Sequence, residues 1–156
     1  MDQGADHPNV VVAPPLLVLG ALAAAFVVDA GWPAPFLGGG MQYALGGAVF
    51  ALGLGIVATA IREFRRVGTN VPTFRPTLAL ASGGPYRFTR NPIYVGLCLG
   101  HLGVALAGDS LWAVAAVIPV ALVLHYGVVL REEAFLEGKF GEPYTRYRAA
   151  TRRWLW

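Results

Sequence analysis

The sequence predicts an all-α polytopic membrane protein with four transmembrane helices, a cytoplasmic loop and a C-terminal amphipathic helix that closes a site. Composition is the first reason: of 156 residues, 56% are apolar and 13% charged, whereas soluble domains carry about 25% charged residues. The second reason is charge distribution, because all twelve Lys and Arg residues lie in 62–90 and 131–153. A chain of this length is expected to form a single membrane domain over residues 1–156.

The apolar residues fall into four blocks, which we interpret as spans: 10–28, 42–61, 93–107 and 111–130. The first, second and fourth approach the ~20 residues that a helix needs to cross the hydrocarbon core. The third is shorter, and we expect it to include residues of the polar motif before it. The N-terminus carries Asp2 and Asp6 but no basic residue, so the first block is expected to remain as a span and not to be cleaved as a signal peptide.

The basic residues predict the orientation of these spans. Cytoplasmic loops of membrane proteins are enriched in Lys and Arg, which places 62–90 and the chain after 130 inside, and 29–41 and 108–110 outside. Both termini are then cytoplasmic, in a plasma or inner membrane. Because the positive charge flanks spans, it is expected to set orientation and to attract anionic lipid, and nucleic-acid binding is not expected.

Small residues recur every four positions in two blocks, at Gly47, Ala51 and Gly55 and again at Gly96 and Gly100. Such spacing allows helix backbones to approach closely in lipid, so we expect these residues to pack helices together. A close approach of a ligand to Gly96 or Gly100 is the alternative.

Three further side chains inside the blocks bear on chemistry. The single cysteine, Cys98, cannot form an intrachain disulfide and is expected to be a packing residue. His101 and His125 lie where they can face each other, either with a structural hydrogen bond or in a functional role. No His, Cys and Asp cluster has the spacing of metal ligands, so no metal is expected.

The cytoplasmic segment 69–92 is too long for a simple connector, and four prolines punctuate it. Pro85 favours a turn, and Pro92 favours an extended conformation at Asn91 just before a helix begins. This places Asn91 and Tyr94 at the cytoplasmic mouth of the third span. Helix N-termini attract anionic groups.

Two consecutive carboxylates, Glu132 and Glu133, follow the fourth block directly. A carboxylate at that depth is costly unless a cation or hydrogen-bond donor meets it. They either form a solvated helix end beside Arg131 or belong to a site. The residues that follow suggest an amphipathic helix that folds back and closes a site: Phe135, Leu136, Phe140, Tyr144 and Tyr147.

Three runs in this order, Gly84-Pro85-Tyr86-Arg87, Arg90-Asn91-Pro92-Ile93-Tyr94-Val95-Gly96, and Glu132-Glu133 with Phe140-Gly141-Glu142-Pro143-Tyr144-Thr145-Arg146-Tyr147, lie on one predicted membrane face. They resemble the isoprenylcysteine carboxyl methyltransferase family and its phospholipid methyltransferase relatives. The resemblance covers residues 78–153, which it identifies as the cofactor-binding half.

The resemblance implies that the cofactor is S-adenosylmethionine, held between the loop before the third span and the carboxylate at the end of the fourth. The cofactor-binding residues that it implies are Leu80, Ala81, Tyr86, Asn91, Pro92, Ile93, Tyr94 and Glu132. We assign catalytic roles to Arg90, which can receive the carboxylate of the cofactor, and to Glu133, which can act as a base.

Two positions depart from the family pattern. Asn91 stands where a histidine is frequent, so only hydrogen bonding remains there. Val128 stands where the enzymes that methylate a prenylcysteine carboxylate carry a substrate arginine.

The implied reaction is methyl transfer to a lipophilic or lipid-like acceptor at the cytoplasmic membrane face. Prenylcysteine-like carboxylates, phospholipid amines and small lipophilic thiols all remain open as acceptors. An NADPH-dependent membrane reductase is one rival, since such enzymes share an Arg-x-Pro-x-Tyr-x-Gly element, although an acidic residue usually stands where Leu97 does here. A non-catalytic membrane subunit is the other.

Overall fold

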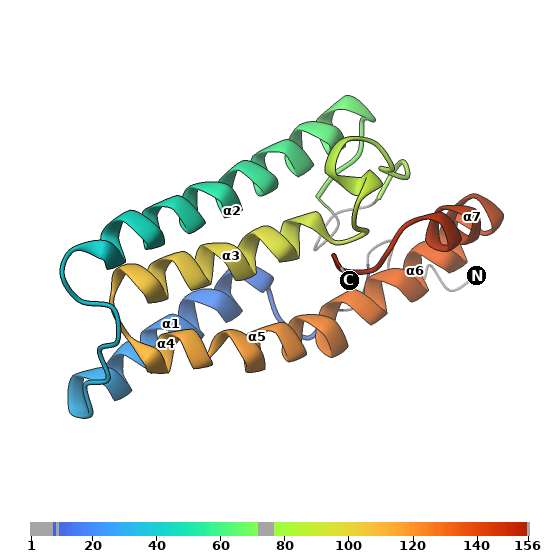
Figure 1. Cartoon of the computed structure of the whole chain (residues 1–156). Helices are drawn as coiled ribbons and strands as arrows, with labels where there is room; N and C mark the ends of the chain where they lie inside the picture. Colours follow the sequence, from blue (N-terminus) through green and yellow to red (C-terminus); the bar gives the residue numbers. More distant parts are fainter. Residues whose placement is uncertain (1–7, 9, 72–76, 156) are drawn as a thin grey trace.

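The computed structural model describes residues 8, 10–71 and 77–155, and all regular secondary structure in these residues is helical, as predicted. Figure 1 shows the long helices running side by side. In chain order the elements are α1 (Pro14–Gly31), α2 (Met41–Arg66), the 3₁₀-helix η1 (Gly84–Arg87), α3 (Pro92–Ala107), α4 (Leu111–Ala115), α5 (Val117–Leu124), the π-helix η2 (His125–Val129), α6 (Leu130–Phe140) and α7 (Glu142–Ala150).

Within the described ranges, three helical runs are long and apolar enough to cross a membrane. They are Pro14–Gly31, Met41–Arg66 and Leu111–Phe140, with mean hydropathies of 1.8, 2.1 and 2.3 in their apolar windows. α3 is also apolar but has 16 residues, fewer than the ~20 of a typical span. Large side chains such as Leu52 and Ile118 are exposed on these helices, which is typical of a surface that contacts lipid.

The helix ends differ from the predicted blocks because prolines and turns set them. α1 begins at Pro14 instead of residue 10, since a proline in the first turn has no N–H that needs a partner. For the same reason α3 begins at Pro92, inside the polar motif. The last run continues past residue 130 to Phe140, so Glu132 and Glu133 lie inside a helix and do not follow one.

α2 and α3 are in close contact through glycines, but not through all of those predicted. A Cβ added to Gly53 would lie 2.6 Å from the carbonyl oxygen of Gly96, and one added to Gly103 would lie 2.5 Å from the amide of Phe50. Gly47 and Gly55 instead face away, with nothing within 4 Å of an added Cβ. The prediction that they pack helices within this chain was wrong, because the helix turns a neighbouring face toward α3.

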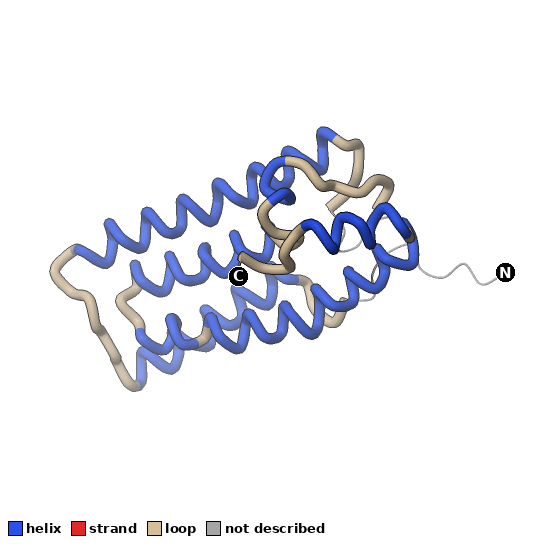
Figure 2. Tube along the Cα trace, turned by 45° about the vertical axis from the view of Figure 1, so that its right-hand side comes forward, coloured by secondary structure: helices blue, strands red, loops and turns tan. Residues whose placement is uncertain are grey.

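The two ends of the bundle differ. Figure 1 shows the connections 32–40 and 108–110 at one end, and Figure 2 shows the segment 77–91 and α7 together at the other. At the first end, Asp109 accepts hydrogen bonds from the backbone of Phe36, Leu37 and Gly38. The second end contains the polar residues of interest.

The two histidines of the apolar helices have separate hydrogen-bond partners. His101 Nε2 lies 2.9 Å from the carbonyl oxygen of Ala113, which joins α3 to α4. His125 Nδ1 accepts a hydrogen bond from Trp154 Nε1 at 3.2 Å. This bond joins η2 to the C-terminal segment, residues 151–155, which follows α7. In both cases the partner indicates a structural role.

Candidate functional site

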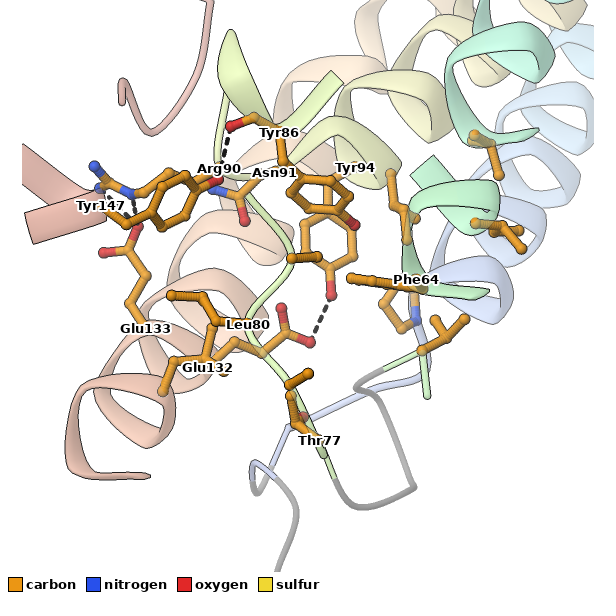
Figure 3. A pocket seen from close by; sticks show the side chains of 18 of the residues that line it. Phe64, Thr77, Leu80, Tyr86, Arg90, Asn91, Tyr94, Glu132, Glu133 and Tyr147 are labelled. Atoms are coloured by element: carbon orange, nitrogen blue, oxygen red, sulfur yellow. Dashed lines mark hydrogen bonds and ion pairs between the residues drawn. The ribbon is translucent and has the colours of Figure 1, made fainter. Parts of the chain in front are cut away.

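One cavity of about 230 Å³ lies where η1, the first turn of α3, the first turn of α6 and α7 meet (Figure 3). Every predicted site residue except Pro92 lines it. The remaining lining residues are Pro14, Pro15, Val57, Ile61, Phe64, Val71, Thr77, Ala79, Leu97, Leu136, Tyr144 and Tyr147. The structure therefore brings together residues that lie on two separate sequence stretches.

Glu132 and Tyr94 form the centre of the cavity. The Tyr94 hydroxyl donates a hydrogen bond of 2.7 Å to Glu132 Oε1, and both residues are buried (Figure 3). α3 supplies the tyrosine from its first turn and α6 supplies the glutamate from its first turn. A carboxylate out of water needs donors, and the second oxygen of Glu132 has no recorded bond within the described residues.

Glu133 and Arg90 form an ion pair with each other, and both also bond to residues near the C-terminus. Arg90 donates to Glu133 Oε1 through Nε at 3.2 Å and Nη2 at 2.8 Å. Its Nη1 donates to the carbonyl oxygens of Arg148 and Thr151 at 2.9 and 2.6 Å. Arg153 forms a second pair with Glu133, at 3.0 and 2.8 Å. All three nitrogens of the Arg90 guanidinium are thus engaged, and the predicted catalytic roles of Arg90 and Glu133 stay predictions.

The side chain of Asn91 faces the C-terminal segment. Its Nδ2 donates to the carbonyl oxygen of Arg153 at 2.9 Å, and its backbone N–H donates to Thr89 Oγ1. The amide of Tyr94 is bonded to the carbonyl of Asn91, and Pro92 has no N–H. Among the described residues, the amide of Ile93 in this first turn of α3 has no backbone partner.

Tyr86 is held on three sides. Its ring packs against Phe64 with centroids 5.1 Å apart, its N–H donates to Gly83, and its carbonyl accepts a bond of 2.8 Å from the Tyr147 hydroxyl (Figure 3). Burial raises the pKa of Tyr86 and of Tyr147 far above the usual value, and raises that of Tyr144 to about 12. These phenols stay protonated at neutral pH and can donate hydrogen bonds.

Thr77 is a lining residue that sequence reasoning missed. It is buried, and its Oγ1 has no hydrogen-bond partner within the described part of the chain. Buried hydroxyls are normally bonded, so this atom is an exception in the cavity wall. Phe64 was also missed, because an aromatic residue at a helix end carries no specific signal.

The described residues contain no group of three or more His, Cys, Asp or Glu side chains suited to hold a metal ion. The polar groups at the cavity are instead carboxylates, phenols, a guanidinium, an amide and a hydroxyl. They suit an organic ligand with several hydrogen-bonding groups.

An all-helical, apolar bundle with a largely apolar cavity at one end, into which a few polar groups are set, defines a membrane-associated binding or catalytic protein. Comparison with known sequences specifies the class: the sequence model of the phospholipid methyltransferase family matches residues 41–143. The chain belongs to the phospholipid methyltransferase family, as the resemblance predicted.

Individual relatives match parts of the chain. The cobalt-zinc-cadmium resistance protein CzcN of Cupriavidus metallidurans is 42% identical over 69 residues, 44% of this chain and 32% of that protein. A Haemophilus influenzae protein is 44% identical over 64 residues, 40% of this chain and all of its own length. The phosphatidyl-N-methylethanolamine N-methyltransferase of Emericella nidulans is 32% identical over 115 residues, 72% of this chain and 55% of the enzyme. The chain thus spans about a third of the length of CzcN and about half of the length of the Emericella nidulans enzyme. No solved structure matches significantly.

Proposed function

We propose that this member of the family is an integral membrane enzyme that transfers a methyl group from S-adenosylmethionine to a lipophilic acceptor. The observation that carries the proposal is the buried Tyr94–Glu132 pair at the cavity, whose wall includes a Thr77 hydroxyl without a hydrogen-bond partner among the described residues. Family membership supports the reaction class.

The lining fits the cofactor. S-adenosylmethionine would supply a methyl group already activated by a sulfonium. Glu132 would accept hydrogen bonds from hydroxyl or ammonium groups, Thr77 would exchange one with a polar group, and the Ile93 amide would bind a carboxylate. Tyr86, Leu80 and Ala81 would form the wall that excludes water. The chain then has mainly to align the acceptor and to keep the site dry.

The apolar end of the cavity supports a lipophilic acceptor. It is lined by Pro14 and Pro15 of α1, Val57 and Ile61 of α2, and Leu97 of α3. These residues belong to the apolar helices, so an acceptor that enters from the bilayer can keep its hydrocarbon part in apolar surroundings.

The charges at the cavity favour an amine acceptor over a carboxylate. Among the described lining residues, Arg90 is the one cationic side chain, and its guanidinium is fully engaged. Val128, at the position of the substrate arginine of prenylcysteine enzymes, is completely buried. Glu132 carries no ion pair in the described structure, so its carboxylate makes the cavity more favourable to a cationic acceptor than to an anionic one. The Emericella nidulans relative is named for an amine acceptor.

Cofactor binding tests the proposal directly. Isothermal titration of the purified protein in detergent should show binding of S-adenosylmethionine and none of NADPH. Binding of NADPH alone would support the reductase, and binding of neither would support a non-catalytic subunit. Labelled cofactor offered with vesicles of a mono-methylated phosphatidylethanolamine, or with a prenylcysteine, then distinguishes the amine from the carboxylate.

We also propose that residues 1–156 form one membrane domain in which α3 crosses the bilayer as a fourth span, with the site and both termini cytoplasmic. The clustering of basic residues at the site end supports this orientation. In a Cys98→Ser background, a cysteine placed at Arg146 should react with a membrane-impermeant maleimide only from the cytoplasmic side, and one placed at Phe36 only from the other side.

A further inference from the structure

Two polar side chains, Glu63 in the last turn of α2 and Thr69 just after this helix, bond to the cavity wall although neither lines the cavity. Both are buried, with 6% and 8% of their surfaces exposed. Neither contributes to the reaction proposed above. Their hydrogen bonds go to the loop 77–87, which supplies one wall of the cavity.

Glu63 anchors the loop at Gly83. Its Oε1 accepts the N–H of Gly83 at 3.1 Å, and its two oxygens accept Nη2 and Nε of Arg66 at 2.7 and 2.8 Å. The backbone of Gly83 is so close that an added Cβ would collide with Glu63 Oε1. The side chain of Arg66, one turn further along the same helix, therefore orients the Glu63 carboxylate, which meets the Gly83 amide of the loop.

Thr69 anchors the same loop further upstream. Its Oγ1 accepts the N–H groups of Leu78 at 2.9 Å and of Ala79 at 3.3 Å. Its own N–H donates to the carbonyl oxygen of Phe64 at 3.0 Å, which fixes Thr69 relative to the end of α2.

The residues between and just after these two anchors are those that line the cavity. Leu80 and Ala81 lie between the two bonded positions, Ala79 belongs to the first of them, and Tyr86 follows Gly83, to whose carbonyl it donates. The close contacts of α2 with α3 are made by glycines whose near neighbours lie on α3 and not on this loop. Loss of either anchor should therefore loosen the stretch 78–83 without separating the helices, while Tyr86 keeps its contacts with Phe64 and Tyr147.

We propose that Glu63 and Thr69 are positioning residues that set the affinity for S-adenosylmethionine by fixing the stretch 78–83 of the cavity wall. The proposal rests on the proposed function. Because an unmade buried hydrogen bond costs on the order of a tenfold change in an equilibrium constant or more, the effect is large enough to measure.

The test uses paired variants of the full chain in detergent. Thr69→Val removes the acceptor and keeps the shape, whereas Thr69→Ser keeps the hydroxyl. Glu63→Leu removes the acceptor, whereas Glu63→Gln keeps one oxygen for Gly83. Thr59→Val is the matched control, because the Thr59 hydroxyl is exposed and bonds only to Gly55 and Ile56 of its own helix in the described structure.

Titration with S-adenosylmethionine should show a Kd raised at least about tenfold in Thr69→Val and Glu63→Leu, less in Glu63→Gln, and little in Thr69→Ser and Thr59→Val. Hydrogen exchange should become faster at the amides of Leu78 and Ala79 in Thr69→Val, and at the amide of Gly83 in Glu63→Leu. The amides of α2 and α3 should stay protected in both variants. An unchanged Kd with faster loop exchange would overturn the positioning role, and unchanged exchange would overturn the anchors. A wild-type protein that binds no S-adenosylmethionine would refute the proposed function itself, before any variant is compared.

Discussion

The hydroxyl of Tyr94 and the carboxylate of Glu132, 38 residues apart in sequence, are joined by a hydrogen bond of 2.7 Å. The bond connects the first turn of α3 to the first turn of α6 at the cavity. Because both residues are buried, neither partner has water as an alternative.

Replacement of Tyr94 by phenylalanine should therefore weaken both the fold and the site. The variant keeps the ring but leaves Glu132 without its donor, which should cost about 1–3 kcal/mol of unfolding free energy. We expect weaker binding of S-adenosylmethionine, and Glu132→Ala should abolish it. Denaturation and titration in detergent measure the two effects. Tyr43→Phe, at an exposed tyrosine of α2, is the control, and equal behaviour of the two phenylalanine variants would remove the central pair from the site.

Glu133 should matter mainly for stability. Its pair with Arg90 has 9% of each side chain exposed, and removal of one partner of a buried pair costs about 3–5 kcal/mol. Glu133→Ala should thus lower the unfolding temperature strongly. Glu137→Ala breaks a pair of similar length with Arg148, but with 45% and 43% exposed, and should cost about 1 kcal/mol or less.

A second variant at this position, Glu133→Gln, decides between two roles for Glu133. If it is the base that the sequence predicts, Glu133→Gln should lose methyl transfer while its unfolding temperature falls little. If Glu133 instead only holds the C-terminal segment through its ion pairs, the methyl-transfer rate and the unfolding temperature should fall together. The rate should then return toward the wild-type value when it is measured well below the lowered unfolding temperature.

Much of this organisation could be predicted because it follows from composition and from motifs. Long apolar blocks define helices whatever their neighbours are, and the motif residues 84–96 and 132–133 identify the cavity. The sequence could not show that Glu132 bonds to Tyr94 whereas Glu133 pairs with Arg90 and Arg153. Consecutive residues point about 100° apart on a helix, so their separate partners depend on how α6 is rotated.

Helix rotation also explains why the glycines were misassigned. Gly46 and Gly53 face α3, whereas Gly47 and Gly55 do not, and the spacing in sequence does not reveal which set faces a partner. Glu63 was missed for another reason. It stands among basic residues at a helix end, where a solvated charge is the ordinary expectation, and only the fold shows Gly83 beside it.

Alanine at Gly53 and at Gly47 should therefore have opposite effects. At Gly53 the new Cβ would lie 2.6 Å from the carbonyl of Gly96 and 2.8 Å from the amide of Gly100. Backbone atoms cannot move aside freely, so we expect a loss of about 1–3 kcal/mol. At Gly47 the Cβ meets nothing, and removal of a flexible residue from a helix should be neutral or gain up to ~1 kcal/mol. Unfolding of the two variants in the same detergent measures both. A similar loss at both sites would indicate that Gly47 packs against a second molecule.

Asp109 should make the opposite end of the bundle sensitive to acid. Its carboxylate accepts the N–H groups of Phe36, Leu37 and Gly38 at 2.8, 2.7 and 3.1 Å, and these bonds hold the pKa of Asp109 below its ordinary value of 3.8. A group with a lowered pKa in the folded state stabilises the fold above its unfolded pKa, and this contribution is lost as the pH falls through the folded pKa. Asp109→Asn keeps the shape and tolerates the positive φ of 49° at this position, but it cannot carry the charge.

The variant should therefore be less stable than the wild type at pH 7, and the difference should shrink as the pH falls below about 4. Thermal unfolding of both proteins between pH 7 and pH 2.5 gives this difference directly, because every other carboxylate is common to both proteins. Asp109 joins the 32–40 connection to the turn between α3 and α4, so the variant should be destabilised at this end of the bundle. Hydrogen exchange should therefore become faster at the amides of residues 36–38 and stay unchanged at the amide of Tyr94. A difference that stays constant down to the lowest pH would show that the three amides do not depend on the charge of Asp109.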